Sequence, residues 1–380
     1  MYKQRVSAAR ERVTMFANFV EVTLAKEGHT GAVGINLLTK VQFPNLASLY
    51  GAMLAGVDYV LMGAGIPREI PGVLDAFAEH RAARTRLDVE GLSRDETEYL
   101  EFDPCDHWSA PPANLRRPRF LAIVSAASLA ANLIRKSTGS VDGFIIEAAA
   151  AGGHNAPPRG ALRLDERGQP IYGERDVVDF ADIRALGVPF WLAGGVGSPD
   201  GLEVALRVGA AGIQVGTLFA YSDESGIASD IKRRVIDAVI TNEATIFTDP
   251  RASPTGYPFK IVELPGQTGA AASRERVCDL GYLRAAVRLP DGRRVYRCSA
   301  EPVDAYVAKG GDAADTVGRQ CLCNGLTATV GLPQRRADGF EEPAIVTSGD
   351  SLLDLEKFLG GRTSYGAAEV IDYLTGAVPR

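Results

Sequence analysis

Two glycine-ended apolar segments contain the residues best suited to hold an anion. In WLAGGVGSPDGLEVALRVGAAGIQVGTLFA, the first apolar run ends at Gly194 and Gly195, and the second ends at Gly216 and Thr217. Glycine lets backbone N–H groups approach an anion closely, and N–H groups at a strand end or helix start favour phosphate. Either glycine-containing end alone is typical of an ordinary tight turn with no ligand. Two such turns one βα unit apart, however, predict a phosphate site of the kind found late in a barrel.

A candidate general base follows another apolar run. In IIEAAAAGGHNAPPRG, Gly152 and Gly153 precede His154, one of four histidines in the chain. Imidazole titrates near neutrality and is the commonest general base, and the two glycines would let the loop turn over a flat cofactor. A solvated or core-capping histidine is the alternative. The position behind a strand end favours a catalytic role for His154.

Four cysteines fall close together in the last third of the chain. Thiolates in this number could bind zinc tetrahedrally or hold an iron–sulfur cluster, although the spacing is not the C-x₂-C pair of common zinc modules. The alternative is buried thiols that pack as small apolar groups. The expected metal ligands are Cys278, Cys298, Cys321 and Cys323.

The elements that must position these residues form a regular series. Short, continuously apolar runs, typical of strands buried on both faces, alternate with segments of helical spacing. Such alternation predicts βαβ units and a parallel sheet, and therefore an α/β fold that is either a barrel or doubly wound. The expected strands are Ala32–Leu38, Val57–Gly65, Phe120–Ser125, Val141–Ala148, Val188–Gly195 and Ala211–Ala220.

The domain organisation follows from the point at which the alternation of strand-like and helix-like segments ends. The α/β domain is expected over residues 1–250, with a charged, irregular insertion at about 81–118. The proline-punctuated segment RASPTGYPFK then leads into a cysteine-containing helical or irregular extension over residues 251–380.

The composition of the chain argues against some classes of binding partner. The chain has 380 residues, a net charge of −6 and 46% apolar residues, which argues against nucleic acid or an anionic membrane as the main partner. No run of 18 apolar residues predicts a membrane span, and the first residues lack an apolar signal core. Five cysteines are too few for a disulfide framework in so long a chain, so we expect a cytoplasmic protein.

Several motifs, in the same order, resemble the nitronate monooxygenase family. These are VGINLL, VLMGAGIP, EAAAAGGHNAPP and the glycine-ended stretch quoted first, which together cover about residues 32–220. The resemblance implies a TIM (β/α)₈-type barrel that binds FMN. It implies that Gly194, Gly195, Gly216 and Thr217 hold the FMN phosphate, that Gly152 and Gly153 turn against the cofactor, and that Asn36, Gly63, Ser125 and Glu147 lie near the flavin.

The same resemblance implies an activity. His154 would take the α-proton of a nitroalkane, and dioxygen would be the second small-molecule substrate. The family also contains FMN-dependent enoyl-thioester and quinone reductases that use NAD(P)H, so this alternative stays open.

The chain departs from the family at its start. Its six strands match the family's third to eighth, and residues 1–31 read as a connecting helix. We expect either a misassigned start or a shortened barrel with exposed strand edges, which would favour homo-oligomers. A truncated, non-catalytic, metal-binding scaffold is therefore a further alternative.

Overall fold

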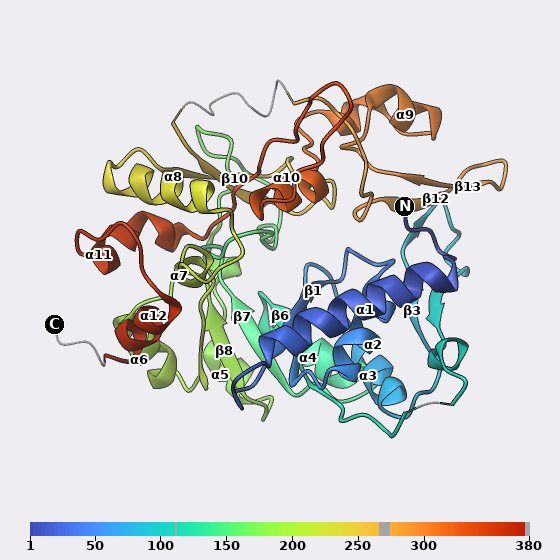
Figure 1. The fold of residues 1–380 in the computed structure, drawn as a ribbon, viewed down its shortest axis with the longest axis horizontal. Coiled ribbons are helices and arrows are strands. Elements are labelled where there is room, and N and C mark those ends of the chain that lie inside the picture. The colour runs from blue at the N-terminus through green and yellow to red at the C-terminus, as the bar shows by residue number, and fades with distance from the viewer. Residues whose placement is uncertain (111, 266–273, 377–380) are drawn as a thin grey trace.

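A curled, six-stranded parallel sheet organises the molecule (Figure 1). The computed structural model describes residues 1–110, 112–265 and 274–376. All six expected strands are present and pair parallel in sequence order, so the prediction of an α/β, barrel-type fold with about six strands is confirmed. The strands are β1 (Gly34–Leu38), β2 (Tyr59–Gly63), β6 (Arg119–Val124), β7 (Gly143–Glu147), β8 (Phe190–Ala193) and β9 (Gly212–Gln214).

The last expected strand is shorter than the sequence indicated. Ala211–Ala220 is not extended throughout: β9 ends at Gln214, and Thr217–Ala220 form the short helix α7. Gly216 already has a right-handed helical backbone, so the chain turns away from the sheet directly after the strand. This turn brings Thr217 back to the strand end.

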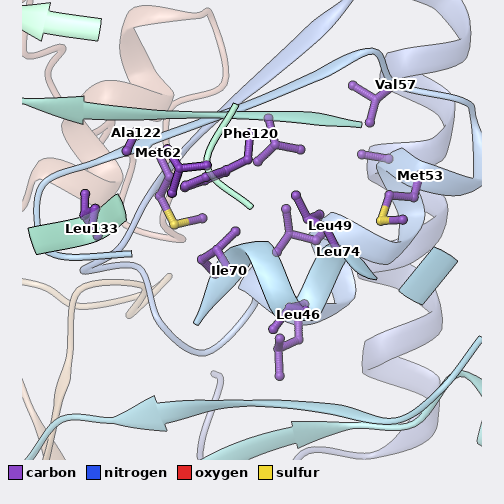
Figure 2. Close-up of a cluster of buried hydrophobic side chains, with 14 of the residues drawn as sticks. Leu46, Leu49, Met53, Val57, Met62, Ile70, Leu74, Phe120, Ala122 and Leu133 are labelled. Carbon is purple, nitrogen blue, oxygen red and sulfur yellow. The ribbon is translucent and has the colours of Figure 1, made fainter. Parts of the chain in front are cut away.

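Alternation along each strand separates two apolar faces. Val60 of β2 and Phe120 of β6 are register partners and point into the main core, while their neighbours Leu61 and Leu121 point to the concave face. The convex face is covered by helices: Leu49 of α2 and Leu74 of α3, for example, pack on Met62 and Phe120 in the cluster drawn in Figure 2. The helices of this layer are α2 (Asn45–Leu54), α3 (Ile70–Ala78), α4 (Ala127–Lys136), α5 (Phe180–Arg184) and α6 (Pro199–Arg207).

The N-terminal segment is helical, as expected. Helix α1 (Ala8–Ala25) lies against α2, and Gly51 of α2 permits the contact because a Cβ there would lie 2.2 Å from the carbonyl oxygen of Met15. The described chain contains no helix both long and apolar enough to cross a membrane.

The insertion at residues 81–118 is more regular than the sequence indicated. Strands β3 (Ala83–Leu87) and β5 (Glu98–Phe102) form an antiparallel pair, and β4 (Val89–Glu90) joins a second small sheet. The insertion packs on the main core through three buried side chains, Leu87, Leu100 and Phe102. The many charged residues around them in the sequence gave no indication of this contact.

The C-terminal extension is built from strands as well as helices, and it returns to the main sheet. β10 (Thr245–Asp249) pairs with β11 (Phe259–Glu263), which ties the end of the α/β region to the extension. The remaining elements are α8 (Ser229–Ile240), β12 (Ala285–Arg288), β13 (Arg294–Arg297), α9 (Val303–Ala308), α10 (Leu322–Thr329), α11 (Leu355–Leu359) and α12 (Ala367–Thr375), with one-turn 3₁₀ helices at Pro104–His107, Glu174–Asp176, Ala313–Thr316 and Asp350–Asp354. Residues 266–273 and 377–380 of the extension lie outside the described residues.

The convex core supplies a direct test of the packing. Leu74→Ala removes a side chain that is 0% exposed, and we expect the free energy of unfolding to fall by about 2–5 kcal/mol because a cavity remains. Leu206→Ala on α6, where the leucine is 53% exposed, is the matched control and should change it by less than about 0.5 kcal/mol. Urea unfolding of both variants measures the difference. Similar losses in the two would contradict the assigned burial.

Candidate active site

A hollow of about 340 Å³ lies at the carboxyl ends of the parallel strands, the edge at which α/β folds place their ligands. We call it the strand-end hollow. It is lined by Asn36, Ile123, Glu147, Ala150, Ala151, Gly152, Gly153, Ala193, Gly194, Gly195, Val196, Gly197, Gln214, Val215, Gly216, Thr217, Ala220, Thr347, Ser348, Gly349 and Ser351. Eight of the ten cofactor residues expected from the sequence are among them.

The turn after β8 requires glycine. Gly194 and Gly195 have φ angles of +85° and +75°, a region that other residues seldom adopt. A Cβ on Gly194 would also lie 2.7 Å from the amide nitrogen of Ala151 and 2.9 Å from the carbonyl oxygen of Ala148. The two strand-end turns therefore touch through their backbones.

The C-terminal extension supplies the opposite wall, which sequence analysis missed. The N–H of Gly349 donates to Thr217 Oγ1 over 3.1 Å, and the N–H of Asp350 donates to the carbonyl oxygen of Ala150 over 3.0 Å. Gly152 permits this approach, because a Cβ there would lie 2.7 Å from Gly349 N. The segment VTSGDS, with its glycine among small hydroxyl residues, was the available signal.

The donors around the hollow are uncharged. Seven of its 21 lining residues are glycine and four carry hydroxyl groups, whereas no lysine or arginine lines it in the described part of the chain. An anion here would be bound by backbone N–H and hydroxyl groups, as in other glycine-rich phosphate sites. This donor set fits the phosphate of FMN.

Polar side chains from three strands also line the hollow. Asn36 comes from β1, Glu147 from the end of β7 and Gln214 from the end of β9. Burial raises the pKa of Glu147 to about 7. The Oε1 atom of Gln214 is buried and has no hydrogen-bond partner among the described residues. A bound ligand could satisfy these groups.

His154 lies just beyond the hollow rather than in its lining. Its Nε2 atom is 2.7 Å from Ser253 Oγ, and its ring meets Phe259 edge-on, with centroids 4.9 Å apart. Burial lowers the pKa of His154 to about 4, so the imidazole is neutral at neutral pH. Ser253 Oγ continues the chain of contacts to Thr255 Oγ1 at 2.8 Å.

Two other expected residues also lie outside the lining. Gly63 ends β2, where a Cβ would lie 3.0 Å from the Cβ of Ile123, so its role in the structure is close strand packing. Ser125 follows β6, and its carbonyl oxygen accepts a hydrogen bond from Arg159. Both are at strand ends, as expected, but neither contributes to the surface of the strand-end hollow.

The predicted metal site is wrong. Within the described ranges, no group of three or more His, Cys, Asp or Glu side chains is arranged to hold a metal ion. Burial instead raises the pKa of the thiols, to about 11 for Cys278 and about 12 for Cys321, and in the same direction for Cys298 and Cys323. With no metal bound, the four thiols are therefore protonated and pack as small, weakly polar groups.

The raised pKa of Glu147 predicts a pH dependence of stability. The ordinary value is 4.5, so between that pH and about 7 the folded protein retains a proton that the unfolded chain has lost. The free energy of unfolding therefore falls as the pH rises through this window. Glu147→Gln abolishes the titration and should stabilise the flavin-free protein at pH 8 by up to about 3 kcal/mol, with little gain near pH 4.5.

Denaturant unfolding of both proteins at several pH values measures this difference. Glu203→Gln on the exposed surface of α6 serves as the control and should show no comparable gain. A stability difference for Glu147→Gln that does not change with pH would contradict the assignment.

Comparisons with known proteins agree with the resemblance to nitronate monooxygenases. Residues 88–253 match the model of the nitronate monooxygenase family. The chain is 30% identical over 136 residues to the "probable nitronate monooxygenase" of Staphylococcus saprophyticus, which is 34% of this chain and 37% of that protein. It is also 31% identical over 118 residues to the (3aS,4S,5R,7aS)-5-hydroxy-7a-methyl-1-oxo-octahydro-1H-indene-4-carboxyl-CoA dehydrogenase of Mycobacterium tuberculosis, which is 31% of this chain and 30% of that protein. The resemblance stated from the motifs is thereby confirmed, and the matched region spans 37% and 30% of the lengths of these two relatives.

The fold has a solved counterpart. The structure of FabK from Thermotoga maritima superimposes with a TM-score of 0.51 and 16% identity, covering 94% of this chain and 79% of that one. At this level of identity the likeness shows the fold alone.

Proposed function

We propose that the chain is an FMN-dependent oxidoreductase acting on a small-molecule substrate. The observation that carries the proposal is the strand-end hollow, in whose lining the glycine turns at Gly194–Gly195 and Gly216 lie beside the hydroxyl residues Thr217 and Ser348. The match of residues 88–253 to the nitronate monooxygenase family supports it.

The roles of the residues follow from their places. The turns after β8 and β9 would hold the phosphate, while Asn36 and Gln214 would hydrogen-bond the polar edge of the ring. FMN, when bound, supplies an acceptor for the substrate's electrons. The chain's own task is to bind and orient the reactants and to move a proton.

The finer proposal is oxidation of a nitroalkane or its nitronate, with dioxygen as the oxidant. His154 is the base proposed from the sequence; its imidazole is unprotonated and held by Ser253, but the burial that lowers its pKa to about 4 also makes it a weak base. Glu147 is a second candidate, because it lines the hollow itself and its pKa of about 7 is matched to proton transfer at neutral pH.

A reductase is the second candidate function. One relative is named as a carboxyl-CoA dehydrogenase, which favours a thioester substrate for this chain. NAD(P)H as the reductant is what the family resemblance implies. Anaerobic stopped-flow mixing separates the two candidates: bleaching of flavin absorbance by propyl nitronate but not by NAD(P)H supports the oxidase, and the reverse supports the reductase. A purified chain that takes up no FMN would favour a non-catalytic scaffold.

A substitution at Gly216 tests the phosphate assignment. A Cβ at Gly216 would meet no atom within 4 Å and the φ angle of −106° is ordinary, so a side chain fits without strain. Gly216→Asp places a carboxylate against the phosphate and should weaken FMN binding by at least about tenfold, whereas the isosteric Gly216→Asn should retain most of the flavin. Flavin absorbance after dialysis, and FMN released on denaturation, give the occupancy. Equal FMN occupancy in the two variants would contradict the assignment of the phosphate to the turn at Gly216.

The identity of the base is tested by measuring the turnover of one nitroalkane by two variants. If His154 is the base, His154→Ala should lower kcat on a neutral nitroalkane by at least about a hundredfold, while turnover of the preformed nitronate and the FMN content remain. If Glu147 is the base, Glu147→Gln should show this pattern instead. Loss of nitronate turnover as well would point to cofactor binding rather than proton abstraction.

A further inference from the structure

A second cavity, of about 380 Å³, opens at the carboxyl ends of β1 and β2 beside the strand-end hollow. We call it the arginine cavity. It shares no lining residue with the strand-end hollow. Its lining residues are Thr39, Lys40, Gln42, Asn45, Met62, Gly65, Ile66, Pro67, Arg68, Glu69, Ile70, Thr85, Arg86, Asp88 and Tyr257.

Two of its three cations have no counter-ion. Lys40 Nζ lies 3.2 Å from Asp88 Oδ2, but Arg68 and Arg86 form no ion pair with any described residue. The Nε atom of Arg68 is buried without a hydrogen-bond partner, and so is Oγ1 of Thr39. Leaving a buried polar atom unpaired is costly, so a water molecule or a ligand is expected to satisfy both atoms.

The local charge favours an anion. Asp88 is engaged by Lys40, which leaves Glu69 as the acid opposing two free guanidinium groups. The first turn of α3 also forms part of the wall through Ile70, and its backbone adds a positive potential of the helix-start kind. Arginine binds phosphate oxygens in a bidentate manner, which suits this arrangement.

The cavity continues into a neighbouring hollow of about 440 Å³, and the two share Lys40, Gln42, Arg86 and Asp88. The second hollow is bordered by Arg94, Pro254, Thr255 and Arg284, among others. Together they form one continuous groove, and each part alone has a volume larger than that of a phosphate ion.

The groove lies within reach of the proposed flavin. Asn36 lines the strand-end hollow and Thr39 lines the arginine cavity, three residues further along the same strand end, which corresponds to roughly 10 Å at the rise of an extended chain. A long substrate could therefore occupy both.

We propose that the arginine cavity binds a phosphate group of a nucleotide-bearing substrate or coenzyme, with Arg68 as the principal ligand and Arg86 and Lys40 in support. The source of the phosphate is either a coenzyme A thioester or a nicotinamide dinucleotide. The reason for such a ligand here rests on the proposed oxidoreductase function, but the binding site does not.

Isothermal titration of the full chain with adenosine 3′,5′-bisphosphate, NADPH and inorganic phosphate tests this site without turnover. Arg68→Gln should weaken binding of the nucleotide that the wild-type chain prefers by at least about tenfold, and Arg86→Gln by a smaller factor. Arg233→Gln, which removes the same charge from the exposed side of α8, is the matched control and should leave binding unchanged.

The outcomes separate the two proposals. Preference for the bisphosphate identifies the coenzyme A source, and preference for NADPH identifies the dinucleotide. Equal affinity in wild type and Arg68→Gln, or absence of binding of all three compounds to the wild type, overturns the arginine cavity as a phosphate site. FMN content is measured in the same samples by absorbance. If Arg68→Gln retains flavin but loses nucleotide binding, both the phosphate site and the flavin function are supported. If the wild-type chain contains no flavin but still binds nucleotide through Arg68, only the flavin function is overturned.

Discussion

Parallel pairing of six consecutive strands is the constraint on which the rest of the structure depends. Each strand from β1 to β9 in this sheet runs in the same direction as its neighbour, so all carboxyl ends meet at one edge. Alternate residues then point to the helices or to the concave face, as Phe120 and Leu121 do. Asn36 and Thr217 thereby line the same hollow although they lie far apart in the sequence.

Close backbone contacts at that edge make the site composite. Gly194 lies against the turn that contains Ala151, and Gly152 lies against Gly349 of the extension. Side chains would separate these segments, and the hollow would lose one of its walls. The C-terminal extension is therefore part of the site, and its backbone hydrogen bonds with Ala150 and Gly153 attach it to the strand ends.

The two cavities at this edge differ in the groups that they offer for binding an anion. The strand-end hollow offers uncharged N–H and hydroxyl donors and contains one acid, Glu147, whose pKa burial raises. The arginine cavity offers charged side chains, Arg68 and Arg86. Backbone donors bind an anion through partial charges, whereas the guanidinium groups bind it through full charges in a bidentate geometry.

The local pattern of the sequence was sufficient for the strands, the first helix and the glycine turns, because continuous apolar runs and helical periodicity depend only on neighbouring residues. It was also sufficient to place Glu147 and Gly216 at strand ends. It could not show that His154 faces Ser253 and Phe259 instead of the hollow, or that the four C-terminal cysteines pack without forming a metal site. Nor could it bring Gly349 to Thr217, because contacts between residues so far apart are decided by how the whole chain packs.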